Sequence, residues 1–151
     1  MKGRYFGTAA LDYVDGVHWD VRYPMSYVAS NGNKYDMCKG TRTDGASSRF
    51  LFGHFNFLPA DAQNTPTAWL HDKHYRTGHV YDNSVPVRVI RRSEADWLFY
   101  DGLKSMNSAT GLRAVRWQTV CSLAWLGLRV FGWSVWNRYR RHETKRTIRR
   151  K

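Results

Sequence analysis

The segment 119–136 constrains the fold most, because this run of eighteen residues contains a single charge, Arg129. A helix that is apolar on nearly all sides is either buried in protein or placed in a bilayer. The run lies near the lower length limit for crossing a membrane, and Arg129 near its middle would cost about 2.5–3.5 kcal/mol on insertion. We therefore expect a core or interfacial helix, within a helical region of about 111–143, in preference to a membrane span.

The basic residues of the chain are concentrated at its C-terminal end. Residues 137–151 contain eight Arg or Lys and one Glu, which is +7 of the formal net charge of +12. Such a tail suits the phosphates of anionic lipid headgroups and of nucleic acid equally well, or it is only a solubilising tail. We expect one compact domain over 1–136 and then this tail, with anion-binding residues Arg138, Arg140, Arg141, Lys145, Arg146, Arg149, Arg150 and Lys151.

Composition and cysteine usage exclude several classes of protein. Aromatic residues make up 15% of the 151 residues, which is too much bulky apolar material for a disordered chain. Cys38 and Cys121 are far apart and form no CxxC motif, so a disulfide scaffold is excluded. The first residues include no long apolar stretch, so we expect no secretory signal and a protein with free thiols in a phage virion or in the host cytoplasm.

Local signals predict a β-hairpin in the N-terminal part of the chain. Residues 17–28 are rich in β-branched and aromatic side chains, Asn31-Gly32 is a strong turn signal, and residues 34–43 can pair back. Pro24 indicates an edge or a break in the first strand. We expect residues 43–57 to form an ordered loop that packs onto the core.

Two helices are predicted after this loop. Thr65 as a cap, Pro66 at the first helical position and Gly78 as the terminator predict a helix over 66–77. A polar loop with Pro86 then leads to a second helix capped by Ser93, whose apolar stripe is at helical spacing. The predicted fold is α+β and mainly helical, with the hairpin packed on two antiparallel core helices and a long C-terminal helix with a basic tail.

A histidine and an aspartate on these two helices form the candidate site. His71 lies on the inward face of the first helix, and Asp96 borders the apolar stripe of the second, where an unpaired buried charge is expensive. A hydrogen bond between them would fix the His71 tautomer and leave the second ring nitrogen free to accept a proton from water, as a general base does. The alternative is a purely structural pair that joins the two helices.

The segments WLHDKHYRTG and SEADWLFYDGLKSM resemble the two core helices of prokaryotic secreted phospholipase A2, over roughly residues 66–106. The resemblance implies His71 as the base that activates water and Asp96 as its orienting partner. It also implies Tyr75 as a hydrogen-bonding support and Asp72 as a calcium ligand. The glycine-rich calcium loop and the flanking cysteines of that family are missing here, so a further calcium ligand would come from Asp44 and the backbone beside it.

A second resemblance covers more of the chain. The motifs TRTDGASSRFLF, WLHDKHYRTG and ADWLFYDGLKSM, followed by a basic and aromatic helix, occur in this order over about residues 17–135. This order is similar to that of domain of unknown function family 1353, which occurs in tailed phages and prophages. The resemblance implies a phage origin and one cluster formed by Asp44, Ser47, His71, Asp72, Tyr75 and Asp96. Tyr100, on the same side of its helix as Asp96, is a further supporting candidate.

Three classes of function remain open from the sequence. The first is an ester hydrolase at an anionic lipid surface, peripheral to the inner membrane, with Trp117, Trp125, Trp133 and Trp136 at headgroup level. The second is a non-enzymatic virion or tail adaptor whose basic end docks on another phage protein or on the genome. The third is a nucleic-acid binder, although no recognised reading motif is present. A zinc site built on His71 and His74 stays as an alternative for the cluster itself.

Overall fold

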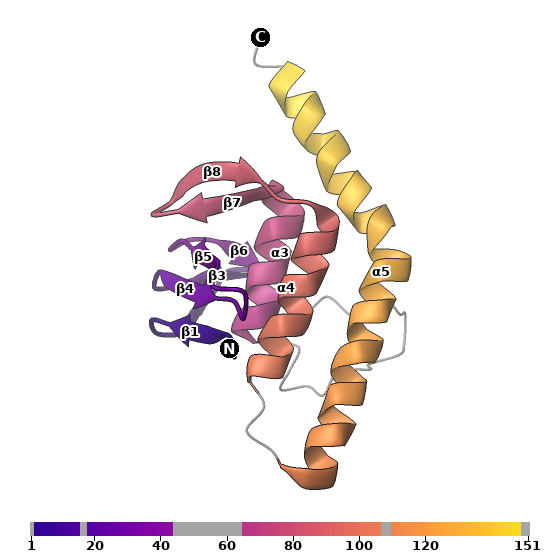
Figure 1. The fold of residues 1–151 in the computed structure, drawn as a ribbon. Helices are drawn as coiled ribbons and strands as arrows, with labels where there is room; N and C mark the ends of the chain where they lie inside the picture. The colour runs from indigo at the N-terminus through magenta and orange to yellow at the C-terminus, as the bar shows by residue number, and fades with distance from the viewer. Residues whose placement is uncertain (1, 16–17, 44–64, 107–109, 149–151) are drawn as a thin grey trace.

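The computed structural model describes residues 2–15, 18–43, 65–106 and 110–148 and has an α+β architecture (Figure 1). The α+β class, the β-rich N-terminal part and the long C-terminal helix are as predicted, but strands contribute more than a mainly helical fold implies. The elements are β1 (Arg4–Phe6), β2 (Leu11–Tyr13), β3 (Trp19–Val21), β4 (Met25–Val28), β5 (Lys34–Met37), β6 (Arg42–Thr43), α3 (Pro66–Thr77), β7 (His79–Asp82), β8 (Val85–Val89), α4 (Arg92–Ser105) and α5 (Gly111–Ile148).

Two three-stranded antiparallel sheets form the N-terminal part, in the orders β1-β4-β5 and β2-β3-β6. The predicted hairpin exists as β4 and β5, in register Val28↔Lys34, and Gly32 in the turn has a left-handed φ of 86°. The chain breaks at Pro24, between β3 and β4, so each predicted strand is divided between the two sheets. The single hairpin expected from the sequence is therefore incomplete, because β3 and β6 pair in a separate sheet.

Helix α3 begins and ends as its sequence signals predict. The Thr65 side chain accepts a hydrogen bond from the Ala68 amide at 3.4 Å, and Pro66 occupies the first turn. Gly78 follows the last turn with a left-handed φ of 67°, and its amide donates to the His74 carbonyl. Both ends of this helix are thus fixed by local chemistry.

The expected polar loop around Pro86 is instead a two-stranded hairpin, β7 paired with β8. All five β8 residues are exposed although valine occurs at every second position, and Pro86 is tolerated because β8 has a partner on one side only. The expected Ser93 cap is also wrong. Helix α4 begins at Arg92 after Arg91, which makes no side-chain cap hydrogen bond, and Ser93 lies inside the first turn.

The three helices pack side by side in alternating directions. Thr67 near the start of α3 contacts Gly102 near the end of α4, which makes α3 and α4 antiparallel as predicted. Trp117 at the start of α5 donates to the Leu103 carbonyl at 3.1 Å. Figure 1 shows the N-terminal sheets on one side of the α3–α4 pair and α5 on the other. Within the described residues, no helix is long and apolar enough to cross a membrane.

A buried polar cluster attaches the first sheet to α4. Asp101 accepts hydrogen bonds from the Tyr27 hydroxyl at 2.6 Å and from the Ser30 amide at 2.9 Å. Its neighbour Gly102 lies against Thr67 and Tyr5, whose hydroxyl oxygens are 2.6 Å apart. Strand β1, helix α3 and helix α4 therefore meet at a point where α4 has no room for a side chain.

We predict that Gly102→Ala lowers the free energy of unfolding by about 1–3 kcal/mol, as overpacking of a well-packed core does. The added Cβ would lie 2.7 Å from both the Thr67 and Tyr5 hydroxyl oxygens, so an element must shift. Gly40→Ala is the matched control, because nothing lies within 4 Å of its Cβ and only the left-handed φ of 75° is strained. A denaturant midpoint of Gly102→Ala equal to that of the wild type would contradict the prediction, and Gly40→Ala shows how much backbone strain alone costs.

Candidate functional site

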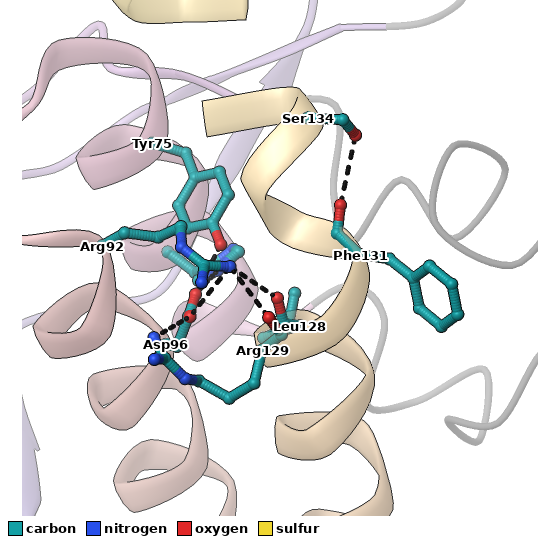
Figure 2. A network of polar contacts seen from close by, with 8 residues as sticks. Tyr75, Arg92, Asp96, Leu128, Arg129, Phe131 and Ser134 are labelled. Carbon is teal, nitrogen blue, oxygen red and sulfur yellow. Dashed lines mark hydrogen bonds and ion pairs between the residues drawn. The ribbon is translucent and has the colours of Figure 1, made fainter. Parts of the chain in front are cut away.

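The carboxylate of Asp96 is completely buried and is contacted from all three helices (Figure 2). Its Oδ1 accepts a hydrogen bond from the Tyr75 hydroxyl and lies 3.8 Å from His71 Nε2, so this oxygen faces α3. Its Oδ2 accepts a hydrogen bond from Arg129 Nη1 at 3.2 Å and lies 3.8 Å from Arg92 Nη1. Oδ1 therefore contacts side chains of α3, whereas Oδ2 contacts side chains of α4 and α5.

The two arginines join α4 to α5. Arg92 precedes Asp96 by one helical turn, and its Nη1 also donates to the carbonyls of Leu128 and Arg129 at 3.1 and 3.2 Å. Figure 2 shows the Arg92 guanidinium between Asp96 and these carbonyls, with the Arg129 side chain approaching the carboxylate from α5. Because one cation contacts both the carboxylate and the backbone of α5, the position of α5 is tied to that of Asp96.

Burial and charge act in opposite directions on Asp96. Burial alone would raise the pKa of its carboxyl, but contacts with His71 and Tyr75 and the Arg92 charge outweigh burial and hold the pKa below its usual range. For Tyr75, burial and the neighbouring Asp96 charge both raise the pKa of the hydroxyl far above its ordinary value. At neutral pH the site therefore contains an ionised carboxylate and a protonated tyrosine.

His71 lies beside Asp96, as predicted, but not within hydrogen-bonding distance of it. The imidazole is 8% exposed and packs between the rings of Tyr75 and Phe99, with centroid distances of 4.2 and 5.1 Å. Its Nε2 is buried, and no hydrogen-bond partner for it exists among the described residues. The distance of 3.8 Å to Asp96 Oδ1 exceeds a hydrogen bond, although Nε2 is the ring nitrogen nearest that oxygen.

Helix α5 covers this cluster closely. Gly132 lies directly over Tyr75, and a Cβ there would be 2.5 Å from the Tyr75 hydroxyl oxygen. The ring of Trp136 meets the Tyr75 ring edge to face at 5.1 Å. Arg140 donates to the carbonyls of Tyr75 and Arg76, both at 2.8 Å, and so caps the C-terminal end of α3.

The residues expected to bind an anionic partner have different surroundings. The expected domain boundary at residue 136 falls inside α5, which continues to Ile148. Arg140 is bound to α3, whereas Arg138 and Arg141 are exposed. Lys145 and Arg146 lie on the last turns of α5, and Arg149, Arg150 and Lys151 lie outside the described residues.

The other predicted site residues lie further from Asp96 or outside the described part of the chain. Tyr100 accepts a hydrogen bond from Gln118 on α5 and is not in the His71–Asp96 contacts. Asp72 accepts a hydrogen bond from the Thr43 hydroxyl at 2.7 Å, which brings the end of β6 against α3. Asp44 and Ser47 follow Thr43 in sequence but lie outside the described residues, as does most of the expected loop over 43–57.

His74, the basis of the zinc alternative, belongs to the core. Its ring is fully buried against Tyr35, with a centroid distance of 5.7 Å, and neither ring nitrogen has a hydrogen-bond partner within the described ranges. Burial and the nearby Lys73 charge lower the pKa of His74 to about 3, so the ring is neutral. No group of three or more His, Cys, Asp or Glu side chains that could hold a metal occurs among the described residues.

Sequence reasoning did not identify Arg92 and Arg129 as parts of the site. The signal for Arg129 was present, because a lone charge in an apolar helix requires a buried partner, but its spacing does not say which one. Arg92 lies four residues before Asp96, the spacing at which charged side chains meet on a helix.

These features define a small α+β domain whose central helices hold a buried His–Tyr–Asp cluster beneath a long C-terminal helix. The family described as Protein of unknown function (DUF1353) matches residues 19–120, and the chain belongs to this family. The match includes both central helices and the start of α5. No curated protein and no solved structure matches the chain significantly.

We predict that Arg129→Met lowers the free energy of unfolding by about 1–3 kcal/mol, because it removes the closest cation from a buried carboxylate. In a double-mutant cycle, Arg129→Met should cost less in the background of Asp96→Asn, where no charge needs compensation. Chemical denaturation of the four proteins measures this coupling. Additive effects would mean that Arg129 and Asp96 do not interact in solution.

His74 makes a separate prediction about acid stability. Because its pKa falls to about 3 in the folded chain, the unfolded chain binds more protons between that value and the ordinary pKa of about 6.5. The folded state should therefore lose up to about 1.4 kcal/mol per pH unit as the pH falls through this window. His74→Phe should remove this slope, measured by denaturation at pH 7, 6 and 5. An unchanged slope would show that other groups cause the acid sensitivity.

Proposed function

We propose that this protein is an ester hydrolase with a site like that of phospholipase A2, in which His71 is the general base and Asp96 orients it. The proposal is carried by one observation. Antiparallel helices bring His71 Nε2 and the Tyr75 hydroxyl to the same oxygen of an ionised, buried carboxylate. Those are the roles that the resemblance of the two helices to phospholipase A2 implies for the three residues.

In this proposal each ring nitrogen of His71 has a different task. Nε2 faces Asp96, so a proton on Nε2 would point at the carboxylate and leave Nδ1 to accept a proton from water. The water oxygen then attacks the ester carbonyl carbon. When the ester C–O bond breaks, the imidazolium returns the proton to the leaving alkoxide. The step requires Nε2 to move closer to Asp96 than 3.8 Å, and catalytic hydrogen bonds are often long before substrate binds.

Calcium, which the resemblance to phospholipase A2 implies, is not supported by the described residues. Asp72 supplies one carboxylate, and the Thr43 hydroxyl donates a hydrogen bond to it. Calcium takes six to eight oxygen ligands, whereas no group of three acidic, His or Cys side chains occurs in the described part of the chain. The proposed step uses only groups of the chain, and added calcium is a variable of the assay.

The test is release of fatty acid from phosphatidylglycerol vesicles, with and without added calcium. We expect His71→Gln to reduce the rate by about 10²–10⁴-fold, the usual contribution of a general base. His74→Phe is the matched control, because it changes a buried histidine on the same helix that makes no contact with Asp96. It should retain the wild-type rate.

Two outcomes would overturn the hydrolase proposal. One is the absence of fatty-acid release by the folded wild-type protein under both calcium conditions. The other is equal release by His71→Gln and the wild type, since a base that can be removed without effect is not the base.

A second candidate is a non-enzymatic phage virion or tail adaptor in which the cluster only joins helices. The observation that favours it is the contact of Asp96 with both Arg92 and Arg129, which supplies the charge that a structural carboxylate needs. This candidate requires the protein to be present in purified particles. Its absence from them would remove the adaptor role.

A further inference from the structure

Helix α5 has a second apolar stripe on the side opposite its buried face. The buried face contains Cys121, Ala124, Leu128 and Gly132. The outer stripe repeats at intervals of three or four residues, interrupted only at Thr119, and its side chains are 49–88% exposed. It consists of Leu112, Val115, Leu123, Leu126, Val130 and Trp133.

The outer stripe is long and lies on the surface of the molecule. From Leu112 to Trp133 it extends about 32 Å at 1.5 Å per residue. Figure 1 shows α5 as the outermost helix, with α3 and α4 on its inner side only. Contiguous apolar surface of this extent is typical of an interaction site and not of a solvated face.

The charges of α5 indicate which partner fits the stripe. From Gly111 to His142 every charged side chain of this helix is an arginine, and Arg113, Arg116 and Arg141 are exposed. A second copy of α5 would add further arginines without a carboxylate along that length. An anionic lipid surface supplies phosphates for the arginines and hydrocarbon for the stripe.

We propose that the outer stripe of α5 docks the protein on an anionic lipid surface, with the helix lying in the plane of the interface. Trp133 and Leu126 would enter the headgroup boundary, and the exposed arginines at both ends would bind lipid phosphates. The sequence predicted four tryptophans of this helix at headgroup level. Two of them are not available, because Trp117 is bound to α4 and Trp136 packs on α3. The docking does not depend on hydrolysis at His71 and goes beyond the proposed activity.

The experiment is co-sedimentation of the full chain with phosphatidylglycerol vesicles and with phosphatidylcholine vesicles. We expect binding to the anionic vesicles that is at least tenfold stronger and that falls as salt is raised. Leu126→Asp should weaken binding to the anionic vesicles at least tenfold. Its thermal unfolding should stay near that of the wild type, because exposed substitutions change stability little.

Val87→Asp is the matched control, since Val87 is 57% exposed on β8, away from α5. It should bind anionic vesicles as the wild type does. Arg116→Glu should weaken binding through charge alone. Each of these results supports the proposal.

Three results would overturn it. The first is a wild-type protein that stays in the supernatant with phosphatidylglycerol. The second is equal vesicle binding by Leu126→Asp and Val87→Asp. The third is a dimer in light scattering that Leu126→Asp dissociates while vesicle binding persists, which would assign the stripe to a second copy of the chain.

Discussion

Asp96 places a negative charge where no water reaches it, and the arrangement of the three helices follows from compensating that charge. Helix α3 contributes a hydroxyl donor from Tyr75, α4 contributes Arg92 one turn before the carboxylate, and α5 contributes Arg129. A buried carboxylate without these partners would be protonated or would destabilise the fold. Because Arg92 also binds the backbone of α5, compensation of one charge fixes the position of a helix of 38 residues.

The same constraint explains one of the two apolar sides of α5. Its inner side must be small and apolar to approach Tyr75 closely, and Gly132 provides the closest approach. Its outer side is apolar although it packs against no other described helix. The average hydropathy of the segment does not separate the two faces of the helix, so it predicts a core helix and an interfacial helix equally. Only the three-dimensional position separates the face that packs from the face that remains exposed.

Local signals predicted the parts of the fold that are determined locally. The bounds of α3 follow from Thr65, Pro66 and Gly78, and the proximity of His71 to Asp96 follows from placing both on inward helix faces. The hairpin of β7 and β8 was missed because Pro86 lies inside its second strand, and a proline indicates a loop or an edge more often than a strand. The role of Arg140 was also missed, since its pairing with the carbonyls of α3 joins residues more than sixty positions apart.

The two oxygens of the Asp96 carboxylate have different partners, which explains how a structural and a catalytic role can coexist. Oδ2 meets the arginines of α4 and α5, whereas Oδ1 meets Tyr75 and faces His71. One oxygen can therefore hold the helices together while the other orients an imidazole. Substitution of Asp96 disturbs both functions, so a loss of stability there does not distinguish them. His71 does distinguish them, because its described contacts are with rings and with one carboxylate beyond hydrogen-bonding distance, and not with the arginines that position α5.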